Sequence, residues 1–306
     1  NLPMTTDAIF GIASMTKPIT ATAVLMLQDA GQLSVSDPVS KYIPAFRDAA
    51  NRAQHWSYPL HNLALSYVET GDYANAIRAY RKAIDLTPEY GYLPYNLGLV
   101  YQRLNRNKDA EKSYRQALKA SPDLAEAYNA LGTLKAAENK TQEAEQWYRD
   151  ALQRNAGLLP ARHNLAVLLA AQPSRRMEAI ALLRENVQRS PRFVASQVSL
   201  AETLEAAGDA VGAAQAYRQV LQLAPNYVGA RLALARLLLS AGDLAGAAEQ
   251  AQQSGDANAI GLELLGDVRT KQSLAADART AYQAALALKP ERAERKRIEA
   301  KLKAVR

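Results

Sequence analysis

The sequence predicts an all-α solenoid built from stacked helical hairpins. Only 15 of its 306 residues are Gly and 13 are Pro, whereas 48% are apolar. The abundant Ala, Leu, Arg, Gln and Glu are good helix formers. Prolines also recur at a fixed interval, because 34 residues separate Pro88 from Pro122 and Pro191 from Pro225. The residues between these prolines recur in register, and a period of this length is typical of helical-repeat proteins.

Three kinds of residue recur at fixed places within the period. A small residue stands in the expected first helix, at Ala64, Gly98, Gly132, Ala166, Ala201, Ala235 and Gly266. A tyrosine stands in the expected second helix, at Tyr80, Tyr114, Tyr148, Tyr217 and Tyr282. Glycines mark the turn at Gly71, Gly208 and Gly242. Small residues let the two helices approach closely, tyrosine and leucine at helical spacing fill the seam between hairpins, and a turn glycine permits the backbone conformation that ends a helix.

This pattern resembles the tetratricopeptide repeat family over residues 57–292, about three quarters of the chain. The resemblance implies a right-handed superhelix of about seven helix-turn-helix repeats. We expect them at 57–90, 91–124, 125–158, 159–193, 194–227, 228–258 and 259–292. The pattern departs from the family in three places: Ala156 replaces a proline, Pro173 stands where a turn glycine is expected, and the sixth repeat is short.

The C-terminal residues 293–306 are expected to form a basic capping helix. From Lys289 to Arg306 the chain carries eight basic and three acidic residues, which is much of its net charge of +7. Such a run can bind an anionic partner such as nucleic acid or a membrane surface, or it can be a solvated helix that closes the solenoid. No aromatic residue is interleaved for base stacking, so the sequence favours the cap and disfavours nucleic acid.

Residues 1–46 do not follow the repeat. They contain the run Phe10-Gly11-Ile12-Ala13-Ser14-Met15-Thr16-Lys17-Pro18 and, later, Asp37-Pro38-Val39-Ser40-Lys41-Tyr42-Ile43-Pro44. This segment resembles the active-site segment of serine β-lactamase-related hydrolases, which include class C β-lactamases, D-alanyl-D-alanine peptidases and related esterases. The resemblance implies Ser14 as the nucleophile that attacks an acyl carbon and Lys17 as its base.

The other parts of such a site are missing from this sequence. The hydrolase family also needs a Tyr-x-Asn loop, a Lys-Thr-Gly or His-x-Gly strand, and oxyanion donors. The match Tyr73-Ala74-Asn75 falls in the turn of the first repeat, and Lys140-Thr141-Gln142 lacks the glycine. We therefore predict that residues 1–46 form a helical cap joined through a junction at 47–56. The alternative is a serine acyl hydrolase that acts on a small-molecule substrate when the missing parts come from elsewhere.

The resemblance to the repeat family also predicts where a partner binds. In that family the first helices line a concave face, and contacts come from positions 2, 5, 6, 9, 12 and 13 of each repeat. The expected groove residues are Tyr58, His61, Asn62, Tyr92, Tyr95, Asn96, Asn129, His163 and Asn164, with Leu65 and Leu99 beside them. Amides bond both donors and acceptors of an extended backbone, and tyrosines supply stiff contact area. We predict a non-catalytic scaffold that binds a protein or an extended peptide.

Two features of this groove narrow the prediction. The carboxylate clamp of chaperone-binding relatives needs a lysine and an asparagine where this chain has His61 and Leu65, so chaperone tails are not the expected partner. The three histidines, His55, His61 and His163, lack metal-ligand spacing and there is no cysteine, so neither a metal nor a cofactor is expected. No apolar run reaches the length of a membrane span, and the compartment stays open between cytoplasm and periplasm.

Overall fold

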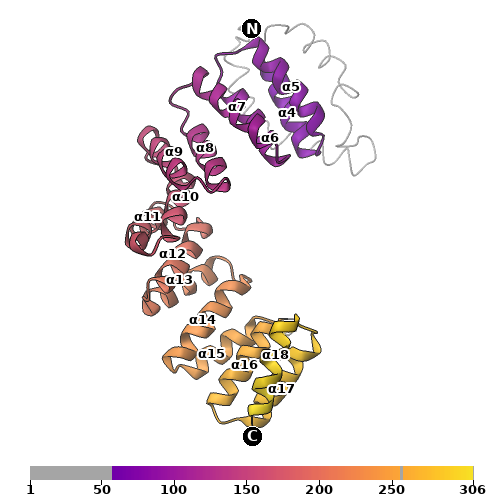
Figure 1. Cartoon of the computed structure of the whole chain (residues 1–306), viewed down its shortest axis with the longest axis vertical. Coiled ribbons are helices and arrows are strands. Elements are labelled where there is room, and N and C mark those ends of the chain that lie inside the picture. The colour runs from indigo at the N-terminus through magenta and orange to yellow at the C-terminus, as the bar shows by residue number, and fades with distance from the viewer. Residues whose placement is uncertain (1–56, 256–257, 306) are drawn as a thin grey trace, which may run out of the picture. The chain divides into compact units, whose positions relative to one another are not determined.

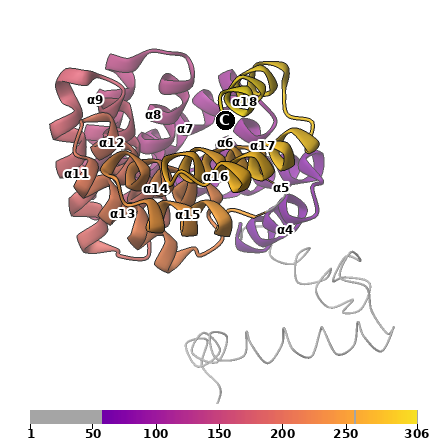
Figure 2. The same cartoon turned by 90° about the horizontal axis from the view of Figure 1, so that it is seen from below.

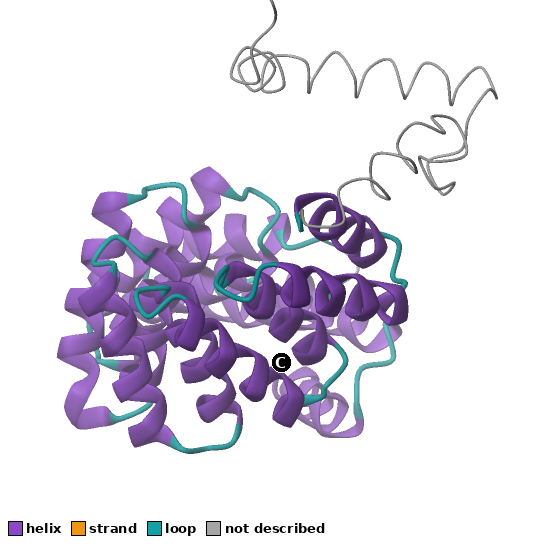
Figure 3. Ribbon diagram, turned by 90° about the horizontal axis from the view of Figure 1, so that it is seen from above, coloured by secondary structure: helices purple, strands orange, loops and turns teal. Residues whose placement is uncertain are grey.

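The computed structural model describes residues 57–255 and 258–305, and every regular element in these ranges is a helix (Figures 1 and 3). The predicted all-α helical-repeat fold is therefore confirmed, while the handedness of the superhelix stays a prediction. The predicted cap at 1–46 and junction at 47–56 lie outside the described residues. The chain divides after Ala127 into two compact units, which are described separately.

The first unit contains two complete hairpins. Its helices are α4 (Tyr58–Glu69), α5 (Tyr73–Leu86), α6 (Tyr92–Arg103) and α7 (Asn107–Ala120). Helix α5 packs against α6, which stacks the two hairpins on each other. The unit ends at the first residues of α8 (Ala125–Ala137), a helix that continues into the second unit.

The second unit continues the alternation of first and second helices. After α8 it contains α9 (Thr141–Arg154), α10 (Leu159–Ala170), the short 3-10 helix η1 (Pro173–Arg175), α11 (Arg176–Arg189), α12 (Val194–Ala206), α13 (Ala210–Leu223), α14 (Val228–Ala241), α15 (Leu244–Gln253), α16 (Ala259–Lys271), α17 (Ala275–Ala287) and α18 (Arg292–Ala304). Helix η1 lies where Pro173 replaces the expected turn glycine. This proline therefore changes the turn of that repeat but does not end the series of hairpins.

The small residue of each first helix allows a close approach to the second helix. A Cβ atom added to Gly132 would lie 2.6 Å from ring carbons of Tyr148, and Gly98 and Gly266 meet the rings of Tyr114 and Tyr282 in the same way. These tyrosines are buried. The ring that fills the seam therefore leaves room for only a small residue at these positions, as the sequence pattern predicted, and Ala64 and Ala201 take the same position opposite Tyr80 and Tyr217.

The turn between the two helices needs a left-handed residue. Gly71, Gly208 and Gly242 have φ of +76°, +84° and +84°. In three other repeats the corresponding residues are Asn105, Asn139 and Ser273, with φ of +57°, +60° and +63°. Asparagine tolerates this region better than most residues. A search for turn glycines alone therefore finds only three of these six left-handed turns.

Helix ends follow from the same repeat. The aspartate after each turn glycine begins the second helix: the carboxylates of Asp209 and Asp243 each accept a hydrogen bond at 2.9 Å from the backbone N–H three residues on, which satisfies an otherwise free donor of the first turn. Four prolines follow the second helices, each one residue after the C-cap, at Pro88, Pro122, Pro191 and Pro225. A proline cannot continue a helix, and it fixes the frame that the sequence analysis detected.

A buried polar network joins α10, α11 and α12 in the second unit. Arg162 donates to the Asn186 carbonyl at 3.0 Å, and Asn186 donates to Ser196 Oγ at 3.0 Å. The Ser196 hydroxyl can accept this bond and still donate its own hydrogen. Nδ1 of His163, which lies 3.2 Å from Ser196 Oγ, can accept that hydrogen. Arg162 also pairs with Glu185 at 3.2 Å. The network is fully satisfied, and it fixes neighbouring repeats in register.

The C-terminal helix α18 is held by ion pairs to the last repeat. Figure 2 shows it beside α17. The buried carboxylate of Glu263 accepts from Arg297 at 2.6 and 2.7 Å and pairs with Lys301 at 2.8 Å, and Asp267 accepts from Lys301 at 2.6 Å. Burial alone would raise the pKa of Glu263, but the hydrogen bonds from these cations outweigh it and lower that pKa. Two basic residues of the expected cap thus face the chain itself.

We expect Leu131→Ala to lower the free energy of unfolding by about 2–5 kcal/mol, because removing a buried leucine leaves a cavity. Leu131 is fully buried, whereas Met177 is 70% exposed and serves as the control. Met177→Ala should change stability by less than about 0.5 kcal/mol. Urea unfolding of both variants checks this, and equal effects would contradict the assigned packing.

The turn residues give opposite predictions for two substitutions. Gly208→Ala should destabilise by about 1 kcal/mol, since a left-handed L-residue is strained. A Cβ at Gly208 meets no atom within 4 Å, so a steric clash does not contribute. Ser273→Gly should instead stabilise by about 0.5–1 kcal/mol, because the serine at the same turn position is already strained. Thermal unfolding would contradict this account if both changes had the same sign.

The buried network also predicts a pH dependence of stability. Burial lowers the pKa of His163 below 6.5, its value in the unfolded chain. The folded state therefore resists protonation: its stability is full above about pH 6.5 and falls as the pH drops from there towards the lower folded pKa. We expect His163→Gln to reduce the slope of unfolding free energy against pH between about 7 and 5. His61, which is also half-buried with a lowered pKa, remains in that variant. An unchanged slope would show that His163 titrates normally.

Candidate functional site

Two adjacent first helices of the first unit present polar and apolar side chains on one surface. On α6, Asn96, Leu99 and Arg103 are spaced three and four residues apart, which places them along one helix face. On α4, Leu65 occupies the position of the repeat that Leu99 occupies on α6. Leu65 and Leu99 are 42% and 41% exposed. Both leucines are therefore available for contact, although leucines of a packed repeat are usually buried.

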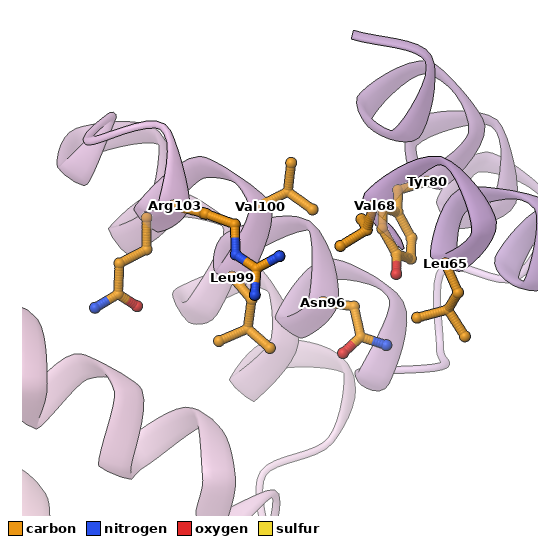
Figure 4. Close-up of a pocket in the computed structure, with 8 residues that line it drawn as sticks. Leu65, Val68, Tyr80, Asn96, Leu99, Val100 and Arg103 are labelled. Atoms are coloured by element: carbon orange, nitrogen blue, oxygen red, sulfur yellow. The ribbon is translucent and has the colours of Figure 1, made fainter. Parts of the chain in front are cut away.

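A pocket of about 380 Å³ lies between these helices. It is lined by Leu65, Val68, Tyr80, Asn96, Leu99, Val100, Gln102 and Arg103. Figure 4 shows the Asn96 amide between the side chains of Leu65 and Leu99, with the Arg103 guanidinium beside Leu99. Tyr80, the buried tyrosine of α5, also lines the pocket, and burial raises its pKa to about 12. The pocket thus has apolar walls and polar groups at its centre and one end.

Asn96 is held in place by a histidine of the preceding repeat. Its Nδ2 lies 3.2 Å from Nε2 of His61. Because an amide nitrogen can only donate, Nε2 must accept, so His61 is neutral and carries its proton on Nδ1. Burial lowers the pKa of His61, which favours this neutral form. The second N–H and the carbonyl of Asn96 have no hydrogen bond to any described residue and are free to bond a ligand.

Tyrosines extend the surface beyond the N-terminal end of α6. The rings of Tyr90 and Tyr92 lie 5.9 Å apart, and Tyr92 meets Tyr95 edge-on at 6.3 Å. Tyr90 and Tyr92 are 48% and 40% exposed, and Tyr58, on α4, is exposed too. These tyrosines offer apolar area that ends in hydroxyl groups.

Tyr95 lies deeper than the sequence analysis expected. It is half-buried, its ring is 5.9 Å from that of Tyr114, and it packs against Ala117 and Leu124. Burial raises its pKa, and the nearby Glu126 raises it further. Tyr95 therefore contributes to the packing of the unit, and its truncation would affect folding as well as any binding. Asn62 is exposed on α4.

The remaining expected groove residues lie in the second unit. The Asn164 amide donates to the Asn129 carbonyl at 2.9 Å, which joins α8 and α10. His163, next to Asn164, ends the buried network through Ser196, and its ring meets that of Phe193 at 5.6 Å. Each of these polar groups thus bonds a neighbouring repeat, and each retains capacity for a further bond.

Sequence reasoning missed four residues of the first-unit surface. Tyr90 precedes α6 and so lies outside the helical pattern, whereas Val68, Gln102 and Arg103 occupy positions 12 and 13 of their repeats. The positional rule of the repeat family includes positions 12 and 13. Positions 12 and 13 of the first two repeats therefore contain the signal for Val68, Gln102 and Arg103.

Other predictions from the sequence concern the N-terminal segment, metal binding and membrane spans. Ser14, Lys17 and His55 lie outside the described residues. Within residues 57–255 and 258–305, no three His, Cys, Asp or Glu side chains gather in a way that could hold a metal ion. In the same ranges no helix combines the length and the apolar character that a membrane span requires.

The N-terminal segment is similar to known hydrolases over a short stretch. The Beta-lactamase family model matches residues 1–57. Protein Rv1367c of Mycobacterium tuberculosis is 46% identical over 43 residues, which are 14% of this chain and 11% of that protein. Esterase EstB of Burkholderia gladioli is 49% identical over 45 residues, 15% of this chain and 12% of the esterase. The chain thus spans about a tenth of the length of these curated relatives.

The described helices are similar to several solved repeat structures. The C-terminal part of a TPR repeat-containing protein from Cytophaga hutchinsonii has a TM-score of 0.64 at 17% identity, over 79% of this chain and 99% of that one. PilF of Pseudomonas aeruginosa has a TM-score of 0.58 at 22% identity, over 64% and 89%. PilW, a type IV pilus biogenesis factor, has a TM-score of 0.57 at 25% identity, over 64% and 91%. These likenesses show the fold.

Family models match most of the repeat region. A TPR repeat model matches residues 64–105. One Tetratricopeptide repeat model matches residues 95–158 and again residues 164–228, and a second such model matches residues 204–259. Together they cover more than half of the chain, with the helical hairpins, small-residue contacts and left-handed turns described above. The chain belongs to the tetratricopeptide repeat family.

Proposed function

We propose that the α4–α6 surface of the first unit binds a partner protein through a segment in extended conformation. The chain as a whole is a protein-binding scaffold of the tetratricopeptide repeat family, and the proposal concerns which residues make the contact. The observation that carries it is the pocket in which exposed Leu65 and Leu99 flank the Asn96 amide. A folded repeat gains nothing from exposing two leucines beside a cavity, whereas a binding surface does.

The shape and composition of this surface suit a peptide. Its pocket of about 380 Å³ lies at the small end of the range for ligand sites, and it is open enough to accept a side chain from a chain that passes over it. Tyr90 and Tyr92 continue the apolar area along the α6 axis. Tyrosines at interfaces commonly contribute much of the binding energy because they lose little conformational entropy.

The amide of Asn96 supplies the polar part of the contact. An extended peptide presents both N–H and C=O groups, and each loses free energy if it is desolvated without a partner. The free N–H and carbonyl of Asn96 can satisfy one of each kind. The bond to His61 fixes the amide beforehand, so binding costs less side-chain entropy.

The second unit offers a separate set of contacts of the same type. Asn129 and Asn164 bond each other, as Asn96 bonds His61, and His163 lies beside them. We include these three residues in the proposal as a second peptide contact. The hydrolase alternative with Ser14 and Lys17 stays a sequence-based hypothesis, supported by the short similarity of residues 1–57 to the Beta-lactamase family.

The proposal predicts the effect of truncating two exposed anchors. Peptides selected on the full chain from a random display library should bind Tyr92→Ala and Leu99→Ala about thirtyfold more weakly, since loss of a central anchor commonly costs about 2 kcal/mol. Fluorescence anisotropy measures the affinities, and circular dichroism checks that both variants stay folded.

The matched control is Tyr227→Ala in the second unit. Tyr227 is 42% exposed, close to the value for Tyr92, but it lies outside the proposed surface. This variant should bind the selected peptides like the unchanged chain. Equal losses for Tyr92→Ala and Tyr227→Ala, or no loss for Tyr92→Ala and Leu99→Ala, would contradict the proposed surface.

A further inference from the structure

Arg103 differs from the other arginines of the first unit. Four of the five arginines among residues 57–127 use their guanidinium groups within the protein: Arg78 donates to Asn75, Arg81 to the Tyr101 hydroxyl, Arg106 to Asp109 and Arg115 to Glu111. Arg103 makes no hydrogen bond or ion pair with any described residue, although it lines the pocket. An arginine in the last turn of a helix gains some stability from the helix dipole. Figure 4 shows the Arg103 guanidinium beside Leu99. The stabilisation by the helix dipole does not explain this placement, because it does not depend on a contact with Leu99.

The spacing along α6 relates Arg103 to the rest of the pocket. Asn96 and Arg103 are seven residues apart, so they are separated by roughly 10.5 Å along the helix axis. An extended peptide advances about 3.3 Å per residue. A peptide that follows the α6 axis and bonds Asn96 through the backbone of one residue places the side chain of that residue over the Leu65–Leu99 pocket. A residue about three positions away along the peptide then lies level with Arg103.

The charges at the two ends of α6 have opposite signs. Burial raises the pKa of the Tyr92 and Tyr95 hydroxyls, and the nearby carboxylate of Glu126 raises both further, so this carboxylate places a negative charge at the tyrosine end. Arg103 supplies a positive charge at the pocket end of α6. Glu69 takes the corresponding place on α4, but it does not line the pocket. A negative group on the peptide is therefore favoured at the Arg103 end and disfavoured at the tyrosine end.

We propose that this surface selects a peptide segment in which an apolar side chain is accompanied, about three residues away, by an aspartate or glutamate. The apolar side chain fills the pocket between Leu65 and Leu99, and the carboxylate pairs with Arg103. A guanidinium suits this role because its planar donors match the two oxygens of a carboxylate. The inference rests on the proposed function, since it names the partner chemistry of the same surface.

The test compares peptides selected on three full-length proteins. A random twelve-residue library, displayed with blocked C-termini, is selected on the unchanged chain, on Arg103→Gln and on Glu69→Gln. The unchanged chain and Glu69→Gln should enrich an apolar residue with an acidic residue about three positions away. Arg103→Gln should keep the apolar residue and lose the acidic one. Enrichment of peptides without an acidic residue, or the same acidic peptides on Arg103→Gln, would overturn the inference while leaving the proposed function intact.

A selected peptide then gives the strength of the contact. Changing its acidic residue to the amide should weaken binding to the unchanged chain about three- to fivefold, as expected for an exposed ion pair. The same change should have little effect on Arg103→Gln. Equal losses on both proteins would overturn the pairing.

Two other outcomes are decisive as well. If the acid appears only in a second library with free C-termini, the partner group is a terminal carboxylate, and the proposed side-chain recognition is wrong. If no peptide is enriched on any of the three proteins, this inference and the proposed function both fail.

Discussion

The contact between a small residue of the first helix and a tyrosine of the second, which five of the repeats can make, determines much else in this chain. At Gly98, Gly132 and Gly266 the ring lies so close that a single methyl group would overlap it. The hydroxyl of such a tyrosine passes between the helices and bonds the first helix further along: Tyr114 donates to Gln102 at 2.7 Å and Tyr217 to Glu205 at 2.8 Å. In the hairpins that have this tyrosine, the seam therefore sets the spacing of the two helices and also orients residues at position 12 of the repeat. In the first repeat the corresponding ring, Tyr80, lines the pocket itself. The geometry of the proposed binding surface is in this way a consequence of core packing.

Polar side chains on the first helices connect several repeats to the element that follows one period later. His61 bonds Asn96, Asn164 bonds Asn129, and Glu263 bonds Arg297, in each case about one period apart in the sequence. These residues occupy positions 5 and 6, which the repeat family uses for partner contacts. They thus have two roles, since a side chain fixed by a neighbour is also preorganised for a ligand. An amide at such a position therefore supports the neighbouring repeat and still keeps hydrogen-bonding capacity for a ligand.

The sequence was sufficient for the helices, because prolines, turn glycines and small residues each act through local backbone geometry or a repeated contact. It was less informative for the surface. Tyr92 and Tyr95 look alike in the sequence, yet Tyr95 packs against Tyr114 and Leu124 while Tyr92 stays exposed. The difference depends on what the neighbouring helices place beside each ring, and no periodicity contains that information. The same holds for Arg103: its lack of a partner is a property of its surroundings, whereas Arg106, three residues on, pairs with Asp109. Ser273 also adopts the left-handed turn conformation, and a sequence pattern defined by glycine does not identify it.

The C-terminal helix shows why net charge is a poor guide to the partner of this protein. Its basic residues are numerous, but Arg297 and Lys301 point towards Glu263 and Asp267, where hydrogen bonds at 2.6–2.8 Å bring opposite charges together. If these pairs were broken, the buried carboxylate of Glu263 would have no cationic partner. The free-energy cost of that unpaired buried charge is larger than the stabilisation that a new exposed ion pair with an anionic partner would provide. An anionic partner that recruited Arg297 and Lys301 would have to meet that cost, whereas one that bound Arg103 would not. An acid that pairs with Arg103 therefore breaks no ion pair among the described residues, whereas an acid that recruits Arg297 or Lys301 breaks one.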